Sequence, residues 1–238
     1  AMDDTRPILT GVLATFSDNE LTLAAADSFR LAVRSGLLTR KAAGDFSVIV
    51  PGRTLSELSR ILQTSGEGEG AGEVSITVTP NRNQIVFAAP DLQVVSRLIE
   101  GNFPNYKQII PSKFATSIVV ATGDLLKAAK IASYFSRDNS NVITLDVQPG
   151  AEAGVGNVVV SGVAAELGED RGEIDAVING AGTKISFNSR YVADVLGVVE
   201  STQVKLEISG PNSAAVFRPN DTVEYTHVVM PIHTPSGR

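Results

Sequence analysis

The sequence predicts an α+β protein in which antiparallel sheets and helices form separate layers. Three observations support this fold class. Short apolar segments follow one another with turn residues between them, as in antiparallel meanders. Longer segments with helical periodicity come between the groups of strands. The same order of elements then occurs a second time along the chain. Strands grouped apart from helices are typical of antiparallel sheets covered by helices on one face.

The first half opens with a predicted β-meander. Its strands are expected at residues 7–14, 21–26 and 29–34. The turn at 17–20 has the sequence Ser-Asp-Asn-Glu, and Asp and Asn favour turns because their side chains bond the nearby backbone. A further strand is expected at 46–50.

A helix is predicted at residues 51–62, because Leu55, Leu58, Ile61 and Leu62 recur at helical spacing and form one apolar stripe. The glycine-rich segment 65–73 then reads as a flexible connection. It is no phosphate-binding loop, because no Lys-Ser or Lys-Thr follows it. Three more strands are expected at 74–78, 84–88 and 93–99.

The second half begins with a strand and a helix before its own meander. Asp124 lies near the N-terminus of this helix, where the helix dipole favours an anion. The strands are expected at 116–121, 142–147, 158–163, 173–178, 184–187, 204–208, 214–217 and 223–229, and the helices at 123–136 and 188–199.

The two halves form an internal repeat. The strand at 48–50 and its following helix align with the strand at 185–187 and the helix after it. The strand at 74–78 aligns with the strand at 204–208, at a slightly smaller shift in residue number. The two shifts differ by about the length of the glycine-rich insertion in the first half. Consistent shifts at several elements indicate duplication. The opening strand and helix of the second half have no counterpart in the first. We therefore expect the chain to be a fragment built from βαβββ units.

Composition excludes several classes of protein. The chain is 43% hydrophobic and 19% charged, as in ordinary globular proteins. The absence of cysteine excludes disulfides, thiolate metal sites and cysteine nucleophiles, and it fits a reducing cytoplasm. The net charge of −6 argues against general binding to nucleic acids or anionic membranes, although a local basic surface remains compatible with it.

A metal-dependent enzyme is the alternative function. Its ligands would come from an acidic stretch that contains Glu166, Glu169, Asp170, Glu173 and Asp175. The spacing is not that of an EF-hand, and ordinary surface charge explains it more simply. The two histidines, His227 and His233, are accompanied by no nucleophile elbow.

An apolar run, Val228-Val229-Met230-Pro231-Ile232, lies near the C-terminus. Such a run is typical of a last strand or of a wall of a groove that a partner fills.

Five motifs together resemble one family. They are Thr5-Arg6-Pro7-Ile8-Leu9-Thr10-Gly11-Val12, Asp27-Ser28-Phe29-Arg30-Leu31-Ala32, Gly101-Asn102-Phe103-Pro104-Asn105-Tyr106, Phe187-Asn188-Ser189-Arg190-Tyr191-Val192 and the Val228 to Ile232 run. In this order they are similar to the bacterial DNA polymerase III beta subunit, or sliding clamp. The resemblance implies the DNA-clamp fold, with sheets outside and helices lining the inner face. It assigns residues 1–112 to the second domain, without its first strand and helix, and 113–238 to the third.

The resemblance also implies the function. The family is non-catalytic and needs no cofactor. Full-length members form a dimeric ring around duplex DNA in the cytoplasm, at the nucleoid. They tether the polymerase III alpha subunit, the clamp loader and other replication and repair proteins, which insert short peptides into a pocket.

That pocket lies between the second and third domains of the family. Carried over by position, it would comprise Leu9, Ala26, Ser28, Phe29, Arg30, Leu31, Pro104, Gln108, Ile109, Asn188, Tyr191, Val228, Val229, Met230, Pro231 and Ile232. The chain departs from the family at two of these positions. Phe29 stands where family members commonly have a residue with a small polar ring, and Gln108 stands where they often have a basic residue. Its tail also continues to Arg238. An inter-domain core, or a structural ion pair at Arg30, is the alternative reading.

Two further surfaces follow from the resemblance. Cations expected to face DNA are Arg6, Arg53, Arg60, Lys127, Lys130, Arg137 and Arg190. Their excess over nearby acidic residues is slight, which suits loose, sequence-independent phosphate contact; ordinary solvated helix faces are the alternative. Tyr134 and Phe135 would lie at the subunit interface, or else form a buried helix end.

Overall fold

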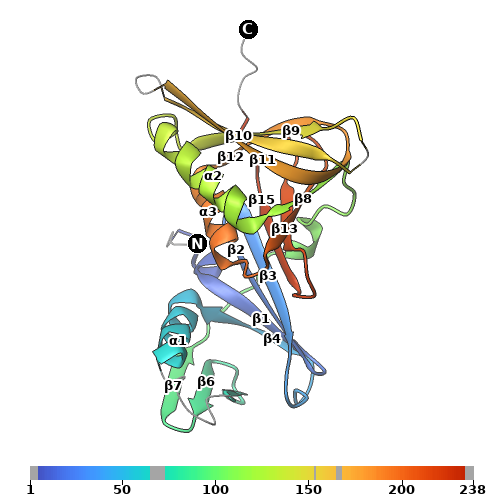
Figure 1. Ribbon diagram of the computed structural model, residues 1–238. Helices are drawn as coiled ribbons and strands as arrows, with labels where there is room; N and C mark the ends of the chain where they lie inside the picture. Colours follow the sequence, from blue (N-terminus) through green and yellow to red (C-terminus); the bar gives the residue numbers. More distant parts are fainter. Residues whose placement is uncertain (1–4, 65–72, 153, 165–167, 234–238) are drawn as a thin grey trace. The chain divides into compact units, whose positions relative to one another are not determined.

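The computed structural model describes residues 5–64, 73–152, 154–164 and 168–233 (Figure 1). The chain folds into two compact units. Unit 1 comprises Ala1–Ser28 and Val33–Asn105, and unit 2 comprises Phe29–Ala32 and Tyr106–Arg238. The domain boundary expected after residue 112 stays a prediction, because compactness alone does not demonstrate independent folding.

Unit 1 contains two groups of strands. Strands β3, β2, β1 and β4 follow one another in one sheet, and β5, β6 and β7 form a separate three-stranded sheet. The elements are η1 (Pro7–Thr10), β1 (Gly11–Ser17), β2 (Glu20–Ala26), β3 (Arg30–Leu37), β4 (Phe46–Pro51), α1 (Gly52–Thr64), β5 (Ser75–Val78), β6 (Gln84–Ala89) and β7 (Leu92–Arg97).

The strand expected at 7–14 begins later than predicted. Residues Pro7–Thr10 form a 3₁₀ turn, and β1 starts only at Gly11. Pro7 fixes φ and has no N–H to donate to a strand partner. The Thr10 hydroxyl donates to the Pro7 carbonyl at 2.6 Å, which closes the turn. Local proline chemistry therefore overrides the apolar pattern of this segment.

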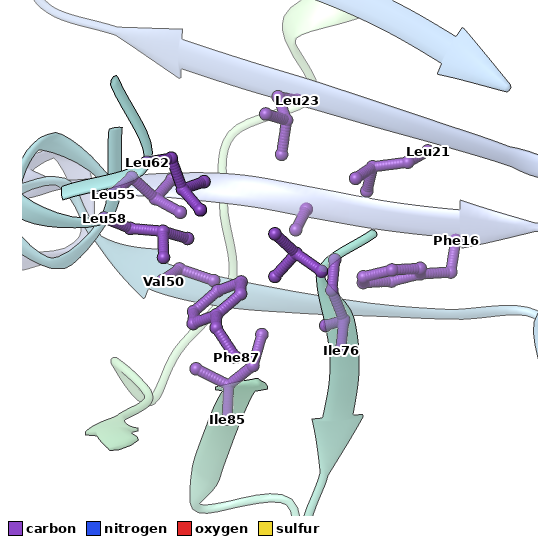
Figure 2. A pocket seen from close by; sticks show the side chains of 12 residues that line it. Phe16, Leu21, Leu23, Val50, Leu55, Leu58, Leu62, Ile76, Ile85 and Phe87 are labelled. Atoms are coloured by element: carbon purple, nitrogen blue, oxygen red, sulfur yellow. The ribbon is translucent and has the colours of Figure 1, made fainter. Parts of the chain in front are cut away.

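Unit 1 has an incompletely filled core. The apolar stripe predicted for the first helix is present on α1, and Leu55, Leu58 and Leu62 line a hollow of about 170 Å³. Figure 2 shows side chains from the helix and the strands pointing into this hollow. Its remaining lining is also apolar and comprises Ala14, Phe16, Leu21, Leu23, Val50, Val74, Ile76, Ile85 and Phe87.

Unit 2 has one continuous sheet with strand order β12-β9-β10-β11-β8-β13-β14-β15. Strand β8 joins its two halves, because Val120 pairs with both Ala176 and Val204. The elements are η2 (Tyr106–Gln108), β8 (Thr116–Ala121), α2 (Thr122–Phe135), β9 (Val142–Pro149), β10 (Gly156–Ala164), β11 (Gly168–Gly180), β12 (Thr183–Asn188), α3 (Ser189–Val198), β13 (Gln203–Ile208), β14 (Ala215–Pro219) and β15 (Tyr225–Val229).

Helices α2 and α3 lie together on one face of this sheet (Figure 1). Small residues let α2 approach the strands closely. Ala129 and Ala132 are completely buried, and a Cβ at Gly162 would lie 2.2 Å from the Ala132 carbonyl oxygen. Glycine is therefore required where β10 passes beneath the helix.

The strand registers confirm the internal repeat. Ala14 pairs with Leu23 and Val48. Leu145 pairs with Val160 and Ile185 in the same manner. Likewise Phe87 lies opposite Ile76, and Phe217 lies opposite Leu206. Among the described residues, unit 1 has no counterpart of β8 and α2.

No helix in the described parts of the chain is both long enough and apolar enough to cross a membrane.

Candidate functional site

Residues 230–233, which follow β15, are bound to other parts of unit 2 at three points. After β15, the Met230 N–H donates to the Phe29 carbonyl at 2.8 Å, and the Ile232 N–H donates to the Ser186 carbonyl at 2.8 Å. His233 Nδ1 lies 3.0 Å from Asn212 Oδ1. These bonds hold the Met230 side chain at the surface, where 41% of the residue is exposed.

An aromatic and cationic cluster surrounds Tyr191 of α3. The ring of Phe29 lies 6.3 Å from the Tyr191 ring, with 23° between the two planes. The Arg30 guanidinium carbon lies 4.5 Å from the centre of the Tyr191 ring. Arg30 Nη1 also contacts Asp194 Oδ2 at 2.5 Å. Tyr191 and Asp194 are three residues apart on α3 and therefore lie on the same side of the helix.

The first turn of α3 positions this cluster. Asn188 is the N-cap residue, and its side-chain oxygen accepts a hydrogen bond from the Arg190 N–H at 3.0 Å. Such a cap satisfies a backbone donor that the helix itself leaves unpaired. The sequence places Asn188 as the first helical residue, and the structure assigns it the capping position instead.

The predicted pocket residues of unit 2 divide into surface and interior positions. Phe29, Arg30, Tyr191 and Met230 are joined by the contacts above. Gln108, the last residue of η2, and the following Ile109 are exposed, while Pro231 and Ile232 are half-buried. Leu31, Val228 and Val229 are buried and belong to the core, and Asn188 is half-buried at the start of α3.

The predicted pocket residues of unit 1 are Leu9, Ala26, Ser28 and Pro104. Leu9 and Ala26 are half-buried, and Pro104 is exposed. Ser28 Oγ accepts a hydrogen bond from Arg6 Nη2 at 2.6 Å. A single pocket formed by all sixteen residues stays a prediction.

The cations expected to face DNA are all exposed. Several have protein partners. Arg60 pairs with Glu57 at 2.8 Å, and the Arg137 guanidinium lies 4.9 Å from the centre of the Tyr134 ring. Lys127 and Lys130 lie on the outer side of α2. Tyr134 is 58% exposed, so the alternative prediction that it forms a buried helix end is wrong. Phe135 is half-buried.

The acidic stretch gives no support to a metal-dependent enzyme. Glu166 lies outside the described residues. Glu169 contacts Arg171 at 3.6 Å, and Glu173 accepts a hydrogen bond from Asn157. Within the described ranges, no group of three or more His, Asp or Glu side chains could hold a metal ion.

Sequence reasoning missed Asp194. The signal was present, because Asp194 follows Tyr191 by three residues on a predicted helix. Its partner Arg30 is distant along the chain, so only folding brings the two together. The ion pair proposed as an alternative for Arg30 is therefore present, on the same surface as the aromatic cluster.

Comparisons with known proteins give consistent matches across the chain. The family model "DNA polymerase III beta subunit, central domain" matches residues 1–105, and "DNA polymerase III beta subunit, C-terminal domain" matches residues 107–233. The beta sliding clamp of Staphylococcus epidermidis is 33% identical over 232 residues, which are 97% of this chain and 58% of that protein. The beta sliding clamp of Staphylococcus aureus is 32% identical over 233 residues, again with 97% and 58% coverage.

Solved structures give the same result. The sliding clamp from Bacillus subtilis matches with a TM-score of 0.88 and 32% identity, covering 99% of this chain and 59% of that one. The DNA polymerase III subunit beta from Pseudomonas aeruginosa matches with a TM-score of 0.87 and 28% identity, covering 98% of this chain and 61% of that one. The chain thus spans somewhat more than half the length of these relatives.

Proposed function

Because this chain belongs to the DNA polymerase III beta subunit family, we propose that it supplies the central and C-terminal parts of a sliding clamp. In this role the protein is a non-catalytic processivity factor. Together with the rest of a full-length dimer, it encircles duplex DNA and tethers the replicative polymerase. One observation carries the proposal. The models of the central and the C-terminal domain match consecutive parts of the chain, and the similarity to a beta sliding clamp extends over 232 residues.

The surface of unit 2 suits capture of a short peptide. Phe29 and Met230 expose 55% and 41% of their surfaces, and such apolar area is released from water when a partner covers it. Methionine adapts to different partner side chains, which suits a site shared by several proteins. Arg30 and Tyr191 supply polar groups that orient the peptide. The partners proposed are the polymerase III alpha subunit, the clamp loader and other clamp-binding proteins.

Contact with DNA is proposed to be loose and independent of sequence. Lys127 and Lys130 on α2, together with Arg53 on α1 and Arg190 on α3, are exposed cations. Few cations produce weak, salt-dependent attraction to phosphates, and a clamp that slides must not bind tightly. This function places the protein in the cytoplasm, at the nucleoid.

Calorimetry with a short clamp-binding peptide from the replicative polymerase tests the peptide site. We expect the peptide to bind the native chain, and Met230→Ala to weaken binding by about tenfold or more, because central apolar contacts carry most of the energy at such sites. Removal of residues 230–238 should abolish binding.

Val95→Ala is the matched control, because Val95 is 55% exposed and lies on β7 of unit 1. Its affinity for the peptide should equal that of the native chain. Unchanged affinity in the shortened chain, or no binding by the native chain, would contradict the proposed site.

A further inference from the structure

We propose that a groove in unit 1 binds a second kind of peptide, an extended segment that carries one acidic and one basic side chain. This inference goes beyond the proposed function, because it concerns another surface and another ligand. The groove has a volume of about 320 Å³, which lies at the lower end of the range for ligand sites, about 300–1,000 Å³. Its lining residues belong to unit 1 alone and come from β1, β4, the turn before β6 and the segment after β7.

The open edge of β4 faces this groove. Strand β4 is the last in its sheet order and pairs with β1 on its other side. On the open edge, the Ile49 carbonyl accepts the Ile99 N–H at 2.9 Å. Backbone groups point to the same edge at every second residue of an antiparallel strand, so the N–H and carbonyl of Ser47 also point there. No strand among the described residues pairs with Ser47 on this edge.

The chain leaves β4 directly after Ile99. A strand continuing from Ile99 would place residue 101 opposite Ser47. Gly101 instead has a φ of 133°, a conformation that residues with side chains rarely adopt. Ser47 and Gly101 both line the groove, which therefore occupies the place of a strand partner. An added peptide can pair with the backbone of Ser47 in this place, as in other complexes in which a peptide extends a sheet edge.

Arg82 and Glu100 bring opposite charges to the lining of the groove. Both residues are exposed, and neither is ion-paired with any residue that the structure describes. A guanidinium donates through coplanar N–H groups to a carboxylate, and a carboxylate accepts from an ammonium group. A peptide that carries one acidic and one basic side chain is therefore complementary to these two residues.

The internal repeat shows what unit 2 has at the same positions. The segment after β7 donates to β4 as the segment after β15 donates to β12. By this match Glu100 corresponds to His233, and Arg82, in the turn before β6, corresponds to Asn212 before β14. In unit 2 the two side chains meet directly, since His233 Nδ1 lies 3.0 Å from Asn212 Oδ1. Unit 1 has two charges at these positions in place of an internal hydrogen bond.

Apolar side chains complete the groove. Leu13 and Ile49 are cross-strand partners and therefore point to the same face of the sheet, and both line the groove together with Phe103. Successive side chains of an extended peptide point to opposite faces. A segment in which threonine and valine alternate with the two charged residues can cover the apolar lining with one face and present its charges on the other.

NMR titration of the 238-residue chain with two synthetic peptides tests the inference. The probe is acetyl-Thr-Asp-Val-Lys-Thr-amide, and its neutral counterpart has asparagine and glutamine in place of aspartate and lysine. We expect the amide signals of Ser47 and Gly101 to shift with the probe. The neutral peptide should bind about tenfold more weakly, because two exposed ion pairs each contribute modestly. Methylation of the valine nitrogen should weaken the probe further, because it removes a backbone donor from the pairing with β4.

Arg82→Gln and Glu100→Gln should each reduce the preference for the charged peptide by about threefold, and the double variant should bring the ratio of dissociation constants to about one. Arg97→Gln is the matched control, because Arg97 is an exposed cation on β7 that does not line the groove. It should leave the ratio unchanged. Equal affinity of the native chain for both peptides, a preference that persists in the double variant, or shifts centred on Met230 instead of Ser47 would each overturn the inference. The proposed clamp function would stand in every case, since it uses other surfaces.

Discussion

Unit 1 and unit 2 share a strand register but differ in how their cores are closed. In unit 2, β8 joins the two halves of the sheet, and α2 covers the strands beside α3. In unit 1, β5, β6 and β7 form a separate sheet, and α1 borders an apolar hollow of about 170 Å³. The same βαβββ order therefore occurs with a large cluster of buried side chains in unit 2 and with an apolar hollow beside the helix in unit 1.

The difference shows which elements complete the fold. The residues around the hollow lie mainly on β1, β2, β4, β5, β6 and α1, and the counterparts of these elements in unit 2 are β9, β10, β12, β13, β14 and α3. In unit 2, α2 contacts several of these elements. Atoms that face a void lose dispersion contacts on that side. The core of unit 1 should consequently be the less stable of the two.

The largest expected effect compares two phenylalanines at equivalent positions. Phe217 is completely buried and meets Phe187 edge to face, whereas Phe87 borders the hollow. Phe217→Ala should cost about 4 kcal/mol, and Phe87→Ala about 2 kcal/mol, because a residue already facing a void has fewer contacts to lose. Hydrogen exchange of amides in β14 and β6 would measure each loss within its own unit. Equal losses would contradict the difference between the cores.

A cavity-filling substitution gives a smaller effect of opposite sign. Ala14 borders the hollow at the register position where unit 2 has Leu145. Ala14→Leu should stabilise unit 1 by roughly 1.5 kcal/mol, because it buries new methyl groups in existing space. Urea unfolding followed by exchange of the β1 amides would measure the gain.

The matched substitution in unit 2 is Ala129→Leu. Ala129 lies on the buried face of α2 and is completely buried, so a larger side chain would overpack its surroundings. It should destabilise unit 2 by about 1–3 kcal/mol. Stabilisation of unit 2 by Ala129→Leu would contradict the expected difference in packing between the hollow of unit 1 and the surroundings of Ala129 in unit 2.

The smallest expected effect concerns the start of the two matching helices. Asn188 caps α3, whereas the equivalent residue before α1 is Pro51, whose side chain offers no acceptor. Asn188→Ala should cost about 1 kcal/mol and lower the melting temperature of unit 2 by about 2–4 °C. Asn188→Ser retains a side-chain acceptor, so its melting temperature should remain close to that of the native chain. A loss as large in the serine variant would show that capping is not the cause.

Part of the candidate site could be predicted from the sequence. The motifs around Phe29, Tyr191 and Met230 identify the family surface because their residues are consecutive in the chain. The N-cap bond of Asn188 is also local, although the predicted helix begins one residue early. The Arg30–Asp194 pair could not be predicted, because its two residues lie far apart in sequence and either could pair elsewhere. The placement of Leu31 in the core rather than at the surface likewise depends on its neighbours in space.

By itself, the sequence determined the order of strands and helices, the internal repeat and the apolar stripe of α1. These features arise from periodicity and turn chemistry within short segments, so they need no knowledge of distant contacts. Only the tertiary structure decided that β8 bridges the sheet of unit 2, that unit 1 retains a hollow and that Arg30 meets Asp194 over Tyr191. Each of these features depends on which sheet edges and side chains approach one another in space. The periodicity of the sequence does not determine these long-range contacts.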